Sequence, residues 1–501
     1  MKRRRKMISL ENTRRAPWPL VLLAMAVLPF AGCAVGPKYH PPVVQAPPAY
    51  KEIGDWKPAQ PNDQNLGGDW WKIFQDPQLD ALELQVNVSN QNLKAAEAQF
   101  RQARAALRYN RADYYPTVTA GLSATRTRVS AHRPPPSSIF DGITYNDFTL
   151  PFDVSYQADV WGRVRKNVES YREQAQASAA DLATVDLSMH ADLAIDYFQA
   201  RSLDAQEQLL NSTVKQYEQA LELNQSRFEG GIASEVEVEQ AKTQLQTTRA
   251  AAIDVGVLRA QFEHAVAILI GNPPAEFSLP PLPLTAPPPR IPVSVPSELL
   301  ERRPDIAAAE RRVASANAQI GVAKAAYYPS LNLFGNGGWQ AADIAKLANV
   351  SSTFWALGAN VAESIFTGGA RRAQVEFAES GYDVNVANYR QSVLTAFQEV
   401  QDDVTGLTVL GQARETQQQA VDAARRTLDL SLDRYRGGLV SYLDVVTAQQ
   451  NLLNNEQEAA VIQGQRLVTS VLLVKALGGG WDASSLAAVQ VKPKLKDVVA
   501  P

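Results

Sequence analysis

Residues that commonly carry catalysis or bind metals are few in this chain and lie far apart. Its four histidines are His40, His132, His190 and His264, and none has another ligand-type residue at the spacing of a metal site. A packed or solvated imidazole is therefore expected at each position. The sequence has no phosphate-binding glycine loop and no nucleophile elbow, and its carboxylates follow the pattern of charged helix faces. We expect no enzymatic activity, no metal site and no bound cofactor.

The one position that indicates covalent chemistry is the single cysteine, Cys33. A basic stretch followed by an apolar run precedes it, so residues 1–32 have the pattern of a secretory signal peptide. Ala31-Gly32-Cys33 resembles a bacterial lipobox. The resemblance implies cleavage after Gly32 and a covalent N-acyl diacylglycerol, with fatty acids such as palmitate, on Cys33. Ala34 in the next position resembles the address of an outer-membrane lipoprotein.

Cleavage at this point would change the charge of the protein. Removing residues 1–32 takes away seven basic residues and one acidic residue, so the formal net charge goes from -3 to -9. A chain this acidic is a poor candidate for non-specific binding to nucleic acid. We therefore expect no nucleic-acid partner.

The body of the chain is built from two copies of one plan. Arg227-Phe228-Glu229-Gly230-Gly231 recurs 207 positions later as Arg434-Tyr435-Arg436-Gly437-Gly438, and Tyr114-Tyr115-Pro116 recurs as Tyr327-Tyr328-Pro329. Internal repetition at this scale decides the architecture of a protein. In each copy a helix ends at Tyr-Tyr-Pro, a hairpin follows, and a long helix then breaks at Gly-Gly and turns into another helix.

These signals predict six segments. They are the signal peptide 1–32, a lipidated extended arm 33–65, repeat 1 at 66–272, a linker 273–297, repeat 2 at 298–480 and a tail 481–501. The linker is rich in proline, which forbids helix.

Alternation of apolar and polar residues predicts two strands in each repeat, at about 117–130 and 147–161 and at about 330–341 and 353–366. In the second of these, Phe148, Leu150, Phe152, Val154 and Tyr156 share one face. Such alternation is typical of a transmembrane barrel strand and equally of any half-exposed sheet.

The helices predicted after the strands are too long for a compact globule. From Arg163 to Asn224 the chain has no proline or glycine, and a helix of about 60 residues extends roughly 90 Å. Apolar and alanine positions spaced by 3 and 4, from Ala241 to Leu269 and from Ala448 to Ala476, predict close coiled-coil packing. Both features are typical of a rod-shaped or tubular protein.

Four strands cannot cross a bilayer as an open sheet, because every backbone donor and acceptor in the hydrocarbon must be paired. The chain must therefore associate, and rotational symmetry is the usual route. Two copies would give eight strands and three copies twelve, and the physical argument does not choose between them.

Several blocks of the sequence resemble the outer-membrane factor family typified by TolC, and most of all its NodT-type lipoprotein branch. These blocks are Cys33-Ala34-Val35-Gly36-Pro37-Lys38-Tyr39, Trp70-Trp71 with Phe74, Asp159-Val160-Trp161-Gly162-Arg163, Arg302-Arg303-Pro304-Asp305-Ile306, Ile365-Phe366-Thr367-Gly368-Gly369 and Tyr442-Leu443-Asp444-Val445.

The resemblance implies a mainly α-helical fold with a small β part. It would form a homotrimer with a twelve-stranded transmembrane β-barrel in the bacterial outer membrane, continued by a long α-helical barrel in the periplasm. It also implies passive efflux of small molecules in a tripartite system. The partners would be a periplasmic membrane-fusion adaptor and an inner-membrane pump, which the lipobox suggests is of the resistance-nodulation-division type.

Carried over from the family, the two Gly-Gly turns would form the periplasmic tips that dock the adaptor. Their residues are Arg227, Gly230, Gly231, Arg434, Gly437 and Gly438. The aperture would lie just after each turn. Its candidates are Leu443, Asp444 and Thr447 in the second repeat, and Glu235, Glu237 and Glu239 in the first. An acidic ring in a narrow pore favours cations.

Of three other interpretations, the sequence argues against the first two and leaves the third open. A rod-like adhesive lipoprotein would not need the alternating strands, and an inner-membrane adaptor would need a β-rich lipoyl-like domain that the sequence lacks. A duct for type I secretion shares the same plan.

Overall fold

The structure is a computed structural model that describes residues 34–44, 47, 68–132, 142–282, 284, 287–289, 291, 299–484 and 486. The chain forms two compact units. Unit 1 takes in Met1–His40, Ala106–Arg172 and Ala314–Asp383, and unit 2 takes in Pro41–Ala105, Glu173–Val313 and Val384–Pro501. Each unit contains residues of repeat 1 and of repeat 2, because the long helices of each repeat extend through the two units.

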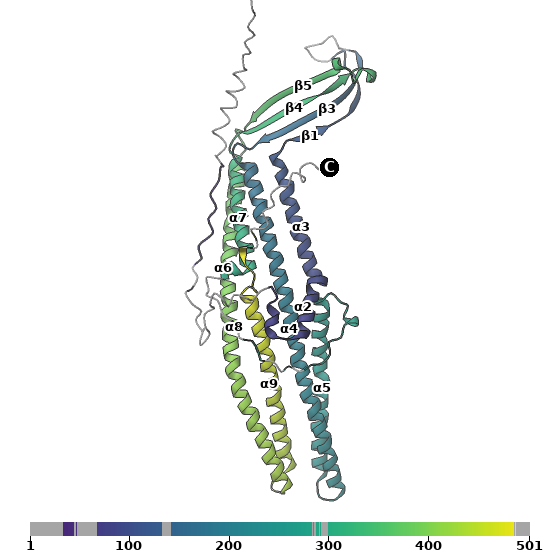
Figure 1. Ribbon diagram of the computed structural model, residues 1–501, viewed down its shortest axis with the longest axis vertical. Coiled ribbons are helices and arrows are strands. Elements are labelled where there is room, and N and C mark those ends of the chain that lie inside the picture. Colours follow the sequence, from purple (N-terminus) through teal and green to yellow (C-terminus); the bar gives the residue numbers. More distant parts are fainter. Residues whose placement is uncertain are drawn as a thin grey trace, which may run out of the picture. The chain divides into compact units, whose positions relative to one another are not determined.

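Unit 1 is built around one antiparallel sheet (Figure 1). Its strands are β1 (Thr117–Ala120), β2 (Ser123–Arg128), β3 (Thr144–Ala158), β4 (Ser330–Ala341) and β5 (Thr353–Ala362). The order is β1-β3-β4-β5, and β2 also pairs with β3. β1 and β2 continue one another along β3 in a single register. Two short 3-10 helices, Ile344–Lys346 and Val350–Ser352, lie between β4 and β5.

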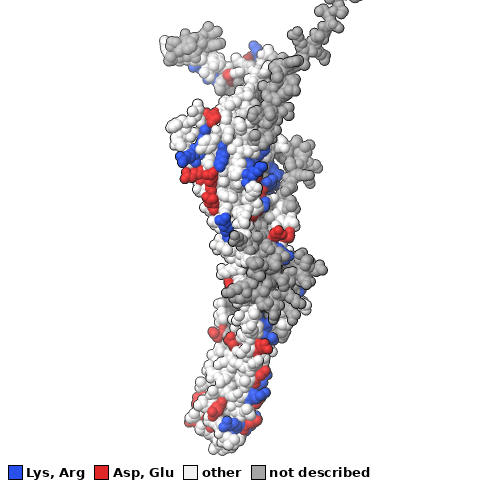
Figure 2. All heavy atoms as spheres, turned by 90° about the vertical axis from the view of Figure 1, so that its left-hand side faces the viewer, with Lys and Arg blue, Asp and Glu red and all other residues white. Residues whose placement is uncertain are grey.

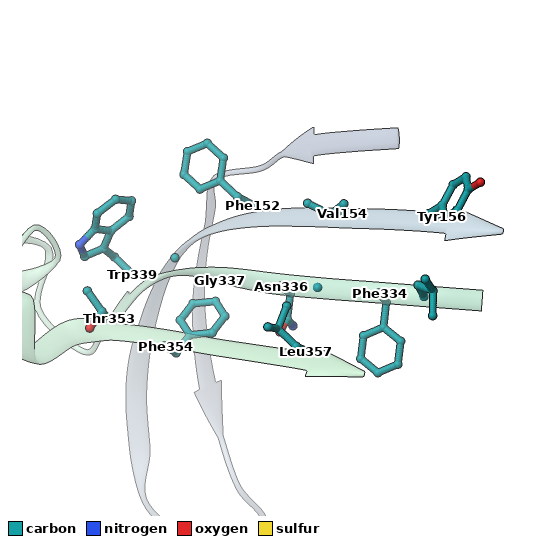
Figure 3. A pocket seen from close by; sticks show the side chains of 13 residues that line it. Phe152, Val154, Tyr156, Phe334, Asn336, Gly337, Trp339, Thr353, Phe354 and Leu357 are labelled. Atoms are coloured by element: carbon teal, nitrogen blue, oxygen red, sulfur yellow. The ribbon is translucent and has the colours of Figure 1, made fainter. Parts of the chain in front are cut away.

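The sheet has one apolar face, as the alternation in the sequence predicts. Phe152, Val154 and Tyr156 lie along β3, opposite Gly337, Gly335 and Leu333 of β4. The two glycines remove side chains from the middle of this face, and a cavity of about 660 Å³ lies between the larger residues (Figure 3). An apolar face of this kind suits contact with hydrocarbon.

At the end of β3 the chain turns directly into a long helix, α4 (Arg163–Glu229). Asp159 begins this helix by accepting hydrogen bonds from the backbone N–H groups of Val164 and Arg165, both at 2.9 Å. Such capping satisfies donors that a helix N-terminus leaves unpaired.

The segment that follows Cys33 also lies in unit 1. The N–H of Val35 donates to the carbonyl of Trp161 at 3.0 Å, and a Cβ placed on Gly36 would come within 2.6 Å of the Cα of Gly321. Only glycine permits so close an approach of two backbones. Cys33 itself lies outside the described residues, as does the predicted signal peptide.

Unit 2 contains most of the helical residues. Besides part of α4, its elements are the 3-10 helices η2 (Trp70–Phe74) and η4 (Pro274–Glu276), and the helices α2 (Pro77–Ser89), α5 (Glu235–Leu269), α6 (Leu299–Arg302) and α9 (Tyr442–Ala476). Three further helices have residues in both units: α3 (Gln91–Arg111), α7 (Pro304–Ala325) and α8 (Ala370–Arg436). A 3-10 turn, Ala112–Tyr114, follows α3.

The main core of unit 2 brings η2 against α4 and α9. Trp70, Trp71 and Phe74 are buried there. Next to them Asp76 caps α2 and also accepts a 2.6 Å hydrogen bond from the hydroxyl of Tyr197. None of the helices in the described part of the chain is both long enough and apolar enough to qualify as a membrane span.

The two helical hairpins, α4/α5 and α8/α9, carry ion pairs at equivalent places but with the charges exchanged. In the first hairpin Glu218 of α4 pairs with Arg249 of α5 at 2.5 Å. In the second, 207 positions later, Arg425 of α8 pairs with Glu456 of α9 at 2.6 Å.

A buried charge network distinguishes the two repeats. Arg259 of α5 pairs with Asp204 at 3.0 Å, and it also contacts Glu263 and the carbonyl of Leu279 in the linker. Its equivalent in α9, Arg466, has Gln463 as its hydrogen-bond partner and no ion pair among the described residues. At the same offset of 207 positions, Gly411 and Ser470 stand where the first repeat has Asp204 and Glu263, so the second repeat keeps the arginine without its carboxylates.

Candidate functional site at the helical tips

The Gly-Gly sequences form two turns of the same geometry. After α4, the N–H of Gly231 donates to the carbonyl of Phe228 at 2.9 Å, and that of Ile232 donates to Arg227 at 2.8 Å. After α8, Gly438 donates to Tyr435 at 3.0 Å and Leu439 to Arg434 at 2.9 Å. This pair of bonds is the Schellman ending of a helix, which places a left-handed residue just after the helix.

Only the second glycine of each pair adopts a positive φ, +71° at Gly231 and +72° at Gly438. No described atom lies within 4 Å of a Cβ built on either residue. Glycine is needed at these two positions for backbone conformation, and the space around them would accept a side chain. Gly230 and Gly437 have ordinary φ values and continue the helical hydrogen bonding.

The two tips contact each other through Tyr435, near the end of α8. Its hydroxyl donates to the carboxylate of Glu237 in α5 at 2.7 Å and lies 3.1 Å from the side-chain oxygen of Asn224 in α4. The guanidinium of Arg227 lies 4.8 Å from the centre of its ring. Burial, and then the hydrogen bond to Glu237, raise the pKa of Tyr435 well above its usual value. The phenol is therefore a neutral donor throughout the physiological pH range.

A small apolar cluster lies under this polar contact. Ala241 of α5 and Tyr442 and Val445 of α9 are buried together, and the ring of Tyr442 lies 5.5 Å from that of Tyr435. The tip of the second hairpin is thus joined to the tip of the first by one aromatic side chain with apolar packing beneath it.

The predicted aperture residues divide into two groups. Leu443, Asp444 and Thr447 lie together at the start of α9 and are exposed, Leu443 by 53 %. Asp444 is engaged in a capping box with Ser441, whose N–H and hydroxyl both donate to it. The hydroxyl of Thr447 donates to the carbonyl of Leu443.

The three glutamates of the first repeat have different surroundings. Glu235 and Glu239 are exposed, and Glu239 forms a 3.3 Å ion pair with Lys242. Glu237 is half-buried and binds Tyr435, so it does not belong to a free acidic group with the other two. Glu235 and Glu239 line a groove of about 540 Å³ along α5, which Val446 of α9 closes on one side.

Sequence reasoning named Tyr435 as part of the repeated motif but missed its contact with Glu237. One signal was present: the equivalent residue in the first repeat is Phe228, so the hydroxyl occurs in one copy alone. Arg434 and Arg436 are exposed at the tip of the second hairpin. Figure 2 shows acidic and basic side chains interspersed on the exposed helical surface at the end that carries the turns.

A second titratable cluster lies in the core of unit 2, where sequence reasoning expected a packed or solvated histidine. The ring of His190 stacks on Trp71 at 4.4 Å, and its Nδ1 lies 2.6 Å from the buried carboxylate of Glu83. Its Nε2 is near Asp186 and Asn87. Within the described residues no group of three acidic, histidine or cysteine side chains could hold a metal ion.

The pKa values of this pair are both shifted upward. Burial lowers the pKa of His190, but hydrogen bonds to Asp186 and Glu83 outweigh it and raise the pKa to about 9. Burial raises the pKa of Glu83 to about 7. The imidazolium form is therefore favoured inside the core.

Comparison with known proteins identifies the family. Residues 84–272 and 295–479 match the profile of the family described as outer membrane efflux protein. The probable efflux pump outer membrane protein TtgC of Pseudomonas putida KT2440 is 32 % identical over 466 residues, which cover 92 % of this chain and 96 % of that protein. The pyoverdine export outer membrane protein OpmQ of Pseudomonas aeruginosa is 33 % identical over 425 residues, covering 83 % and 88 %.

Solved structures agree with this assignment. The outer-membrane channel OprN superposes with a TM-score of 0.83 at 28 % identity, covering 90 % of this chain and all of that one. The open state of the Neisseria gonorrhoeae channel MtrE gives a TM-score of 0.78 at 25 % identity, covering 90 % and 99 %. The fold is that of the TolC-like outer-membrane channels, mainly helical with a small β part. The chain therefore belongs to the outer membrane efflux protein family, as an efflux channel of the outer membrane and periplasm that is not an enzyme.

Proposed function

We propose that three copies of this chain assemble into one duct. Each sheet is four strands wide, because β1 and β2 continue one another along β3, and the three sheets would close into a twelve-stranded barrel. The observation that carries the proposal is the sheet of unit 1. Its order leaves β5 at one edge and β1 with β2 at the other, and its apolar face suits hydrocarbon. Unpaired strand edges are costly in a membrane, and closure into a ring removes them.

We further propose that Cys33 carries the lipid predicted from the lipobox. The described residues next to it support this role. Val35 and Gly36 are held against Trp161 and Gly321, close to the point where β3 ends. A lipid on Cys33, two residues before Val35, would then enter the membrane beside the sheet.

The helical tips would form the periplasmic end of the duct. The contact of Tyr435 with Glu237 and Asn224 holds the second hairpin to the first, so it favours a closed aperture. Opening requires the two hairpins to separate at this contact. Leu443, Asp444 and Thr447 are exposed in the single chain and are available to line the aperture.

The tips would also dock a periplasmic adaptor, which connects the duct to an inner-membrane pump of the resistance-nodulation-division type. Exposed Arg434 and the groove beside Glu235 and Glu239 support docking at this end, since they offer charges of both signs. Transport through the duct is passive, and its cargo is small molecules. The names of relatives that serve efflux and pyoverdine export support that class of cargo.

Two measurements test this function together. The mass of the purified protein in detergent should be that of three chains, measured by native mass spectrometry. The same sample should produce discrete ion conductance in planar lipid bilayers. A monomeric protein, or a trimer with no conductance after the Tyr435 contact is removed, would contradict the proposal.

A further inference from the structure

Two apolar residues between β5 and α8 are almost fully exposed in the single chain. Ile365 is 98 % exposed and Phe366 is 90 % exposed. Large apolar side chains presented next to one another in this way mark a surface that contacts something else.

The same position in the first repeat shows what such a pair contacts. Val160 and Trp161 lie two and three residues after the end of β3, and Ile365 and Phe366 lie three and four residues after the end of β5. The ring of Trp161 stacks on Tyr328 at a centroid distance of 4.8 Å, and its indole N–H donates to the carbonyl of Pro329 at 2.8 Å. The aromatic residue after one strand therefore packs on the Tyr-Tyr-Pro sequence that leads into the neighbouring strand.

The corresponding contact, between Phe366 and the other Tyr-Tyr-Pro sequence, is not formed within one chain. The other Tyr-Tyr-Pro sequence is Tyr114-Tyr115-Pro116, directly before β1, and Tyr115 is 51 % exposed. β1 and β5 are at opposite edges of the sheet, so Phe366 cannot reach this sequence in its own chain. Among the described residues, Phe366 and the sequence Tyr114-Tyr115-Pro116 therefore lack the ring packing that Trp161 and Tyr328 form with each other.

We propose that the missing partner is a second copy of this chain, with Ile365 and Phe366 packed on Tyr115 and Pro116 of the partner subunit. This contact repeats the ring packing of Trp161 on Tyr328 across the boundary between copies, without the hydrogen bond to the proline carbonyl, because Phe366 has no N–H donor. It is head-to-tail, so each copy uses both of its surfaces and the assembly can close into a ring. The inference rests on the proposed assembly and specifies where its copies meet.

The internal contact also sets the register of the strands. Tyr156 lies five residues before Trp161 and pairs with Leu333, which lies five residues after Tyr328. The same spacing counted from Phe366 and Tyr115 places Val361 opposite Ala120 of the partner subunit. This register continues the sheet as β5 with β1, and it keeps apolar residues on one face.

Cysteine pairs test the contact directly. Residues directly opposite on antiparallel strands have Cα atoms about 4.5–5.5 Å apart, which is within the Cα separation that a disulfide spans. We expect the double variant Val361→Cys with Ala120→Cys to give covalent dimers and trimers on a non-reducing gel. The matched control, Tyr156→Cys with Leu333→Cys, has the same geometry within one chain and should remain at the mass of one chain. Shifting the register with Val361→Cys and Leu122→Cys should lower the yield of dimers and trimers.

Single-cysteine variants measure any background from Cys33. A second experiment uses Phe366→Ala and Tyr115→Ala, each of which should lower the temperature at which the oligomer dissociates, while the double variant lowers it little further. One outcome is that the control disulfide between positions 156 and 333 forms, that the protein has the mass of a trimer, and that no disulfide forms between positions 361 and 120. In that case the proposed contact is wrong and the proposed trimer is still supported. If the native mass is that of one chain, the proposed assembly fails as well.

Discussion

Removing the hydroxyl of Tyr435 should shift the aperture toward its open state. The change Tyr435→Phe keeps the ring, its packing on Tyr442 and its contact with Arg227, and it deletes the hydrogen bonds to Glu237 and Asn224. A hydrogen bond to a charged group contributes about 1.5–3 kcal/mol and one to a neutral group about 1 kcal/mol. Because Tyr435 is only half-buried, we take about 2 kcal/mol per chain.

That free energy corresponds to roughly a thirtyfold change in the ratio of joined to separated tips in each chain. If the duct opens only when all three contacts break, the three contributions add to about 6 kcal/mol, or roughly 25,000-fold. We expect single-channel recordings in planar bilayers to show a large increase in open probability or in conductance for Tyr435→Phe.

The matched control is Phe228→Leu, at the equivalent place in the first repeat, where no hydroxyl exists. It should leave the recordings close to those of the unaltered protein. The reasoning is refuted if Tyr435→Phe behaves like the unaltered protein, or if Phe228→Leu opens the pore equally.

Three further outcomes follow from the rest of the chain. Because the pKa of His190 is raised from 6.5 to about 9, its stabilising contribution is complete below pH 6.5 and is lost as the pH rises through 9. The raised pKa of Glu83 acts in the same direction between about pH 4.5 and 7, so thermal melting should occur at lower temperature at pH 9 than at pH 6; a flat profile would contradict this. Arg259→Met should lower the free energy of unfolding by about 1.5–3 kcal/mol, because it removes one of the two arginine partners of the buried Asp204 and the ion pair with Glu263, while Arg201 still pairs with Asp204. Arg466→Met, which breaks no ion pair among the described residues, should change it by less than about 1 kcal/mol; equal effects in denaturant titrations would show that the two repeats do not differ here. Cys33→Ala should abolish incorporation of labelled fatty acid while the protein still assembles, and retained label would exclude the lipobox assignment.

The repeated plan was predictable because its signals are local. Gly-Gly breaks the helices at each tip, Tyr-Tyr-Pro ends the helices that lead into the strands, and alternation of apolar residues marks β3. Each of these depends on residues within a few positions of one another, so the sequence carries them directly. The family followed from the order of such motifs along the chain.

Contacts between distant elements were not predictable in this way. Tyr435 and Glu237 are 198 positions apart, and nothing local to either indicates their hydrogen bond. His190 and Glu83 meet only because α2 and α4 pack in the same core, so no local pattern in the sequence pairs this histidine with a carboxylate. The aperture residues were named from the resemblance to the family, and their role stays a prediction.

The exchanged ion pairs of the two hairpins bear on how the chain reaches its fold. Helices from a duplicated sequence could in principle exchange partners, α4 with α9 and α5 with α8, because their apolar seams follow the same spacing. Such a swap would place Glu218 beside Glu456 and Arg249 beside Arg425, so like charges would meet where the native pairing joins opposite ones. The two reversed ion pairs thus disfavour the swapped pairing and favour the native one, in which α4 packs with α5 and α8 packs with α9.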